Sequence, residues 1–206
     1  MFSVRSPIVT QYQVALGIPS AWSPLATNRI LPLLTQAEHR EGPRLENQFI
    51  ILTGIPGSGK TVYGEYLRST HGFFFIETDK DERFILDAIS PRHLGLVDSY
   101  LKQYPLVAVE WGFFPQLLEC VLRLKNQGAR LLWFFTAEEA TARWAYCVKW
   151  EGNPHKLRLW EDQMQRIKNA DLPTPDFQKI ETFRDGSFRP YDGLDEECFR
   201  GLVTWK

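Results

Sequence analysis

The chain has 206 residues, a length that suits one well-packed domain and is short for two. Hydrophobic residues make up 44% of it and charged residues 24%, which is a globular composition rather than a disordered one. The formal net charge is −1, so the chain lacks the overall positive charge that marks many nucleic-acid-binding proteins.

The first 45 residues differ from the remainder. They contain Pro7, Pro19, Pro24 and Pro32, and one helix is expected among them, near Ile30–His39. We therefore divide the chain into an N-terminal extension, residues 1–45, and a main domain, residues 46–206.

The main domain alternates short apolar runs with longer amphipathic ones. The apolar runs predict strands at residues 49–53, 73–77, 106–110, 129–135 and 177–183. Helices are expected at residues 60–70, 81–89, 94–103, 115–127, 136–150 and 194–205. The fifth of these helices should begin at a capping box, Thr136-Ala-Glu-Glu139. This alternation predicts an α/β domain of three layers around a parallel five-stranded sheet.

The first strand runs into a glycine-rich loop and then into a helix. Between them stands the pattern G-x-x-x-x-G-K-T, in which glycines let successive N–H groups converge on one anion at a helix N-terminus. Lys60 can reach the β- and γ-phosphates, and the Thr61 hydroxyl can ligate Mg²⁺. A chance match in a glycine-rich turn is the alternative, which the strand–loop–helix context disfavours. The pattern predicts a Walker A loop that binds ATP and Mg²⁺ through Gly54, Ile55, Pro56, Gly57, Ser58, Gly59, Lys60 and Thr61.

Other motifs narrow the class of P-loop protein. The D-x-x-G and N-K-x-D motifs of GTPases are absent, and transporter ATPases, helicases and AAA machines need a longer chain. The stretch "ILTGIPGSGKTVYGEYL" followed by "GFFFIETDKDER", within Phe49–Arg83, resembles the P-loop kinases grouped around polynucleotide kinase. Adenylate and gluconate kinases, other small-molecule kinases of the P-loop nucleoside triphosphate hydrolase superfamily, are similar at a greater distance. The resemblance implies a P-loop NTPase fold with a helical lid.

Asp79 is the expected general base. Side chains alternate along a strand, so Glu77 and Asp79 point the same way at the carboxyl end of the second strand, where open α/β sheets form their sites. The resemblance assigns to Asp79 the acceptance of a proton from the attacking hydroxyl. Capping of the next helix is the alternative role, and Glu77 is a weaker candidate for the base. Arg83 lies one residue beyond the D-x-x-R spacing of the family, which puts a substrate-clamping role in doubt.

Glu110 ends the third strand after four apolar residues. This is the Walker B pattern with glutamate in place of aspartate, and it predicts that Glu110 holds Mg²⁺ together with Thr61. A solvated glutamate at a strand end is the alternative.

A lid arginine is expected after the fourth strand. In the kinases that this sequence resembles, such an arginine bends over the γ-phosphate, and Arg143 is the residue at that place. Arg158 and Arg166 are weaker candidates, and a solvated helical face is the alternative for all three. His155 is interpreted as a surface residue, and buried packing is the interpretation for Trp144, Trp150 and Trp160.

The cysteine spacing and the hydropathy of the sequence indicate where in the cell the protein is expected. Cys120, Cys147 and Cys198 show no C-x-x-C spacing, which favours reduced thiols over disulfides or a zinc site. No apolar run approaches transmembrane length, and the N-terminus lacks the basic cluster and apolar core of a secretory signal. We expect a cytoplasmic protein without a membrane partner.

Together these patterns predict a kinase that transfers the γ-phosphoryl group of ATP to a hydroxyl of a small molecule or of a nucleic-acid 5′ end. Lys60 binds phosphates, Thr61 and Glu110 hold the metal, Asp79 takes the proton and Arg143 stabilises the transferred charge. Two alternatives stay open: a regulatory protein that binds NTP without an acceptor, and a kinase-type toxin that acts on a nucleotide sugar. The sequence identifies neither the acceptor nor the oligomeric state.

Overall fold

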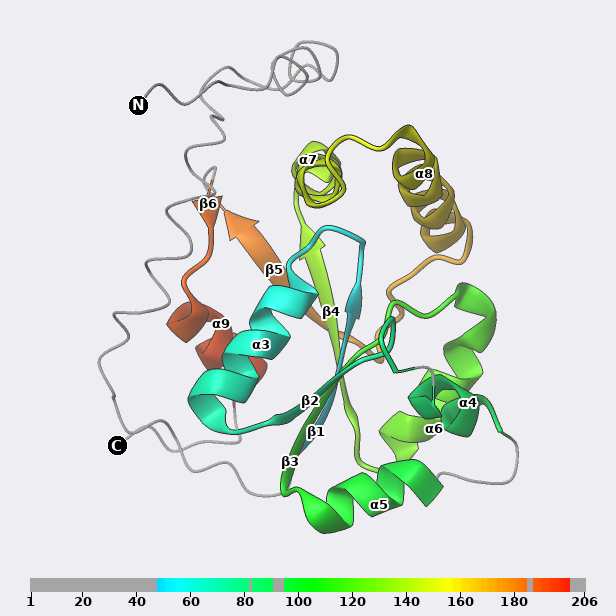
Figure 1. Cartoon of the computed structure of the whole chain (residues 1–206), viewed down its shortest axis with the longest axis vertical. Coiled ribbons are helices and arrows are strands. Elements are labelled where there is room, and N and C mark those ends of the chain that lie inside the picture. Colours follow the sequence, from blue (N-terminus) through cyan, green and yellow to red (C-terminus); the bar gives the residue numbers. More distant parts are fainter. Residues whose placement is uncertain (1–47, 82, 91–94, 185–186, 201–206) are drawn as a thin grey trace.

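A computed structural model describes residues 48–200, except for 82, 91–94 and 185–186 (Figure 1). The predicted extension, residues 1–45, and its helix near Ile30–His39 lie outside the described residues and stay predictions. The described residues contain no helix that is long and apolar enough to cross a membrane.

A six-stranded sheet forms the middle layer (Figure 1), in the order β2-β3-β1-β4-β5-β6. Its strands are β1 (Gln48–Gly54), β2 (Phe74–Glu77), β3 (Leu106–Glu110), β4 (Arg130–Thr136), β5 (Gln178–Arg184) and β6 (Ser187–Phe188). The first five are parallel, whereas β6 runs antiparallel to β5. Six of the seven residues of β1 are buried, as expected for a parallel strand covered on both faces.

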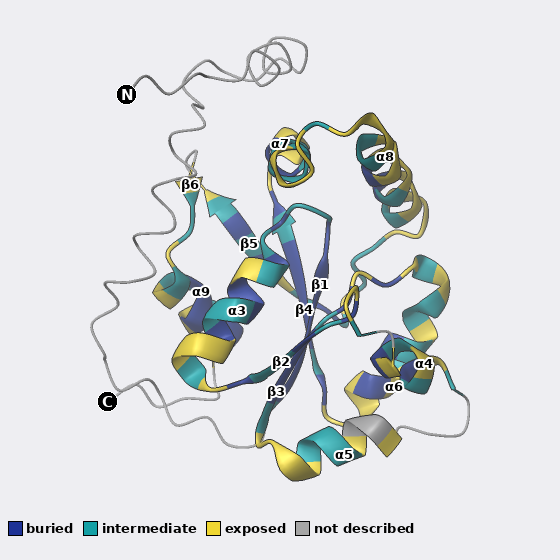
Figure 2. Ribbon diagram, viewed as in Figure 1, coloured by how far each residue is buried: buried dark blue, intermediate teal, exposed yellow. Residues whose placement is uncertain are grey.

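Helices cover both faces of the sheet (Figure 1). The described helices are α3 (Lys60–His71), α4 (Arg83–Ile89), α5 (Gly95–Gln103), α6 (Leu118–Asn126), α7 (Glu139–Lys149), α8 (Pro154–Asn169) and α9 (Tyr191–Cys198), and a 3₁₀ turn, η2 (Pro115–Leu117), precedes α6. Alternate side chains of β1 enter two separate cores: Ile51 faces α4, α6 and α8, whereas Ile50 and Leu52 face α3 and α9. Buried residues accordingly concentrate in the strands and on the inward faces of the helices (Figure 2).

The predicted α/β fold is confirmed, but the predicted sheet is one strand short. All five predicted strands are present, with boundaries shifted by no more than one residue. The sixth strand, β6, pairs Phe188 with Phe183 and Ser187 with Arg184. A strand of two residues shows no alternation, so the sequence contains no periodic signal for it.

The predicted starts of two helices are wrong by three residues. Thr136 does not cap a helix, because it is still the last residue of β4 and its hydroxyl donates a hydrogen bond to the carbonyl oxygen of Glu138 at 2.8 Å. Helix α7 begins at Glu139, without a side-chain cap. Helix α9 begins at Tyr191, three residues before the predicted start, because Pro190 is extended and directly precedes its first turn.

The end of β1 requires glycine on steric grounds. Gly54 has φ of 127°, and a Cβ atom there would lie 2.0 Å from the carbonyl oxygen of Phe134 on the neighbouring strand. We expect Gly54→Ala to lower the free energy of unfolding by about 2–4 kcal/mol, since strain and overlap add. Gly72 also has positive φ, but a Cβ atom there meets nothing within 4 Å, so Gly72→Ala should cost only about 1 kcal/mol. Chemical denaturation of both variants tests this, and equal losses would contradict the steric explanation.

Candidate active site

The carboxyl ends of the five parallel strands meet at one edge of the sheet, and the Walker loop lies there between β1 and α3 (Figure 1). Side-chain hydrogen bonds to backbone carbonyl oxygens hold the loop in shape. The Ser58 hydroxyl donates to the carbonyl oxygen of Ile55 at 2.7 Å, and the indole N–H of Trp160 donates to that of Pro56 at 3.0 Å. Trp160 lies on α8, so the second bond ties the lid region to the phosphate-binding loop.

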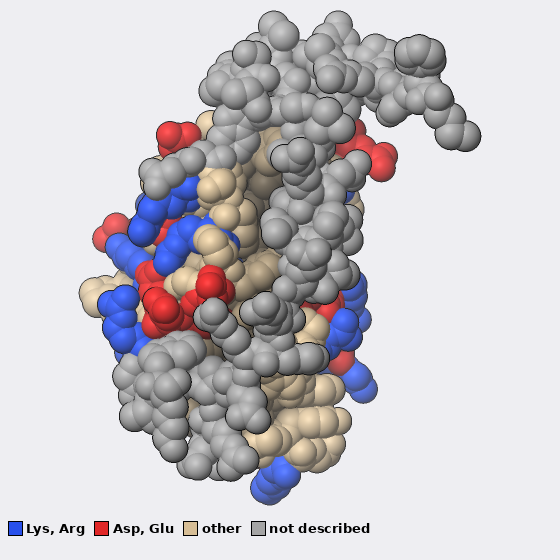
Figure 3. Space-filling view, turned by 90° about the vertical axis from the view of Figure 1, so that its left-hand side faces the viewer, with Lys and Arg blue, Asp and Glu red and all other residues tan. Residues whose placement is uncertain are grey.

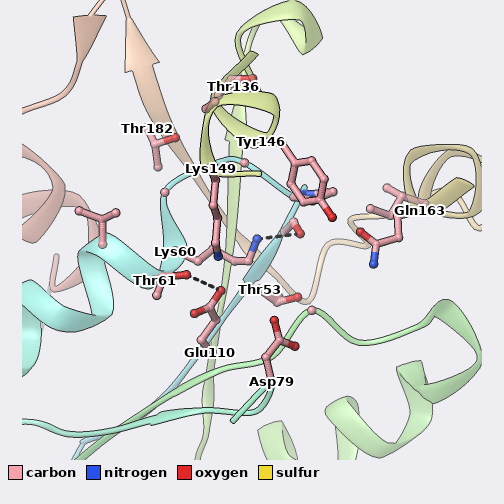
Figure 4. Close-up of a pocket in the computed structure, with 18 of the residues that line it drawn as sticks. Thr53, Lys60, Thr61, Asp79, Glu110, Thr136, Tyr146, Lys149, Gln163 and Thr182 are labelled. Carbon is pink, nitrogen blue, oxygen red and sulfur yellow. Dashed lines mark hydrogen bonds between the residues drawn. The ribbon is translucent and has the colours of Figure 1, made fainter. Parts of the chain in front are cut away.

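Lys60 opens α3 and lies almost entirely below the surface. Its ammonium group donates to the carbonyl oxygens of Ile55 at 2.8 Å and Gly54 at 3.3 Å, within its own loop (Figure 4). Burial lowers the pKa of Lys60 to about 8, although the nearby Glu110 carboxylate raises it. A phosphate group in the loop would add negative charge directly beside this buried cation.

Thr61 and Glu110 bring two oxygens together beside Lys60. The Thr61 hydroxyl donates to Oε1 of Glu110 at 3.0 Å, which joins the start of α3 to the end of β3 (Figure 4). Burial raises the pKa of the Glu110 carboxyl group, and Lys60 and the Thr61 hydroxyl oppose that shift. A carboxylate and a hydroxyl are suitable for Mg²⁺, which prefers oxygen and takes its remaining ligands from water and phosphates. The two residues therefore fit a magnesium ion that is shared with a nucleotide.

Asp79 follows β2 and lines the same cavity as the Walker loop (Figure 4). At the start of α4 the backbone N–H of Arg83 donates to Asp81 rather than to Asp79, at 3.1 Å, and the Arg83 guanidinium donates to Asp81 at 2.6 Å. The other carboxylate considered as a base, Glu77, pairs with Lys80 at 2.6 Å. No described residue forms a hydrogen bond with the side chain of Asp79, so its carboxylate is open to a ligand.

One cavity of about 1010 Å³ joins these groups. Its other walls come from the segment after β3, from α4, from the ends of β4 and β5, and from α7 and α8. Helices α7 and α8 lie where the helical lid was expected (Figure 1). Side chains that point into the cavity from them include Tyr146, Lys149 and Gln163 (Figure 4).

The structure separates Arg143 from the other predicted residues. Its guanidinium donates to the Glu161 carboxylate on α8 at 2.7 Å, and Arg143 does not line the cavity. Lys149, six residues later on α7, does line it and lies above Lys60 in Figure 4. Six residues at about 100° each place these two side chains on different faces of the helix.

Sequence reasoning missed some aromatic lining residues. Trp160 is buried, as interpreted, but Trp150 is 37% exposed and lines the cavity, as does Trp144. The sequence around the three tryptophans does not indicate which of them is buried. Their exposure is decided by how α7 and α8 pack together. His155 is exposed, which agrees with its interpretation as a surface residue.

Positive and negative side chains are mixed on the surface of the described residues. On the face shown in Figure 3, lysine and arginine side chains lie next to aspartate and glutamate, in keeping with the net charge of −1. An extended nucleic-acid-binding surface would need a stretch of positive charge, which this face lacks among the described residues.

Comparison with known proteins bears on the fold. No family model and no curated protein matches the chain. A gluconokinase from Sinorhizobium meliloti 1021 superposes with a TM-score of 0.51 at 18% identity, over 77% of this chain and 93% of that one. Shikimate kinases from Acinetobacter baumannii and Bacteroides thetaiotaomicron are more distant in structure. Their TM-scores are 0.47 and 0.44, at 19% and 14% identity, over 79% and 74% of this chain and 96% and 95% of theirs. At this identity the comparison shows the fold alone: the chain shares the three-layer α/β fold of the gluconokinase.

Proposed function

We propose that the chain is an ATP- and Mg²⁺-dependent kinase that transfers the γ-phosphoryl group to a hydroxyl. The observation that carries this proposal is the convergence of Lys60, the Thr61–Glu110 pair and the open Asp79 carboxylate on one cavity. A protein that only binds a nucleotide would need Lys60 and the Thr61–Glu110 pair but not Asp79. A carboxylate that has no hydrogen-bond partner among the described residues and lines the same cavity as the phosphate site also fits a reaction that must remove a proton.

Each group then has one role. The Walker loop amides and Lys60 bind the β- and γ-phosphates, and Thr61 and Glu110 hold Mg²⁺, which neutralises phosphate charge when bound. Asp79 accepts the proton of the acceptor hydroxyl as its oxygen attacks the γ-phosphorus. We assign to Lys149, rather than to Arg143, the stabilisation of charge on the transferred group, because Lys149 lines the cavity.

A small molecule is the favoured acceptor. The similar structure is named a gluconokinase, which is an enzyme of that kind, and the net charge of −1 does not favour a nucleic acid. The predicted membership of the polynucleotide kinase-like group, and with it a nucleic-acid 5′ end as acceptor, remains the finer hypothesis.

Nucleotide binding is the first test. ATP with Mg²⁺ at about 100 times its dissociation constant should stabilise the fold by about 2.7 kcal/mol, or roughly 5–10 °C in melting temperature. Lys60→Ala should remove most of this shift, because the buried cation no longer meets the phosphates. Lys125→Ala is the matched control, since Lys125 pairs with Asp176 and does not line the cavity. Absence of a shift in the wild type at millimolar ATP would reject the Walker assignment.

A further inference from the structure

Exposed apolar side chains gather at the cavity. Among the described residues, eight large hydrophobic side chains are exposed, and six of them line this cavity: Val62, Leu86, Phe114, Val148, Trp150 and Leu159. Leu86 is 62% exposed and Phe114 is 50% exposed. Exposed apolar residues that occur singly need no explanation, whereas a concentration of them in a cleft indicates a ligand with an apolar surface.

Part of this apolar lining lies on the Asp79 side of the cavity. Leu86 comes from α4 and Phe114 from the segment after β3, and these are the elements that follow the two strands nearest Asp79. The guanidinium of Arg166 on α8 lies over the Phe114 ring at 5.5 Å, so α8 approaches that segment across the cavity. In Figure 4, Asp79 and Gln163 point into the same open space of the cavity. This space is therefore the place for the acceptor, with its reacting end at Asp79.

Positive charge accompanies the apolar lining. Arg166 contacts the Phe114 ring, and the Lys156 ammonium lies over the Trp150 ring at 4.2 Å. Neither cation takes part in an ion pair within the described part of the chain, whereas Arg143 on α7 and Lys168 on α8 do. Cations that rest on aromatic rings keep their charge available to an anion.

We propose that the acceptor is an aromatic compound that carries both a hydroxyl and an anionic group such as a carboxylate or phosphate. The ring would pack on Leu86 and Phe114, and the anion would pair with Arg166. This inference rests on the proposed function, because Asp79 identifies the reacting end. A polyol acid fits less well, since its many hydroxyl groups would lose water against apolar walls without gaining partners.

Transfer of the phosphoryl group forms one bond to the γ-phosphorus and breaks another. The hydroxyl oxygen of the acceptor forms a bond to the γ-phosphorus, and the bond from that phosphorus to the bridging oxygen breaks and leaves ADP. The hydroxyl proton passes to the Asp79 carboxylate.

A panel of five compounds tests the inference by calorimetric binding to the whole chain. Two are aromatic anions with a free hydroxyl, 4-(hydroxymethyl)benzoate and thymidine 3′-monophosphate. Benzyl alcohol and thymidine are their uncharged counterparts, and gluconate is an anion without a ring. We expect each aromatic anion to bind at least about tenfold more tightly than its uncharged counterpart and than gluconate, the size expected for one charge-assisted hydrogen bond. Tight binding of only one of the two aromatic anions would show whether the site selects a carboxylate or a phosphate.

Two variants test whether Arg166 causes the preference for anionic compounds. Arg166→Ala should remove the advantage of the anionic compounds, whereas Lys168→Ala, on the same helix but paired with Glu139 outside the cavity, should leave it intact. The inference is overturned if gluconate binds as tightly as the aromatic anions, if the charge of the ring compounds makes no difference, or if neither aromatic anion binds at millimolar concentration. Because ATP binding is measured separately, a chain that binds ATP but not the aromatic anions would reject this inference alone.

Discussion

Replacing Asp79 with asparagine should lower the rate of phosphoryl transfer by about 10²–10⁴-fold while ATP affinity stays within a few-fold. Asparagine keeps the shape of the side chain but cannot accept a proton. Asp79 forms no hydrogen bond with a described residue and its side chain is exposed, so the substitution should leave the melting temperature nearly unchanged. Single-turnover kinetics with an acceptor that the wild type phosphorylates, together with nucleotide titration, separate the effect on chemistry from the effect on binding.

Glu77→Gln provides the matched control for this experiment. Glu77 ends β2, two residues before Asp79, but its carboxylate is paired with Lys80, so its loss should change transfer little. If Asp79→Asn reduced binding and turnover equally, Asp79 would have a structural role instead. If the wild type bound ATP and transferred phosphate to none of the compounds tested, the regulatory alternative would gain support.

The parts of the site that were predictable are those whose geometry is local. The Walker loop follows from a strand, eight residues and a helix start, all within 25 residues of chain, and Lys60 and Thr61 are the first two residues of α3. Asp79 and Glu110 each follow a buried strand, and parallel strands place their carboxyl ends at one edge. Nothing beyond strand direction was needed to bring them together.

The lid could not be predicted to the same degree. Which face of α7 meets the nucleotide depends on how α7 packs on α8, and that packing includes the ion pair between Arg143 and Glu161. The exposure of Trp150 and the burial of Trp160 have the same cause. The capping box failed for a related reason, because pairing with β5 extends β4 through Thr136. Contacts between segments far apart in the chain leave no periodic signal in either one.

Lys149→Ala should lower turnover by about 10²–10³-fold with little change in the Michaelis constant for ATP, because its charge acts mainly in the transition state. Lys149 is exposed and is in none of the ion pairs of the described residues, so its loss should not destabilise the fold. Lys149→Arg should keep much of the activity, since a guanidinium supplies the same charge with more donors. Arg143→Ala breaks only a partly exposed ion pair and should cost at most about 1 kcal/mol of stability, with turnover per folded molecule preserved.

The opposite result would restore the assignment made from the sequence. If Arg143→Ala abolished turnover and Lys149→Ala did not, the working enzyme would have to separate Arg143 from Glu161 and turn α7 towards the phosphates. Glu161→Gln distinguishes the two cases, because it releases Arg143 without removing it. With Arg143 as the acting residue, this release lowers the cost of closing the lid and raises turnover. With Lys149 as the acting residue, Glu161→Gln leaves turnover unchanged, because Glu161 lies outside the cavity and its partner has no part in the reaction.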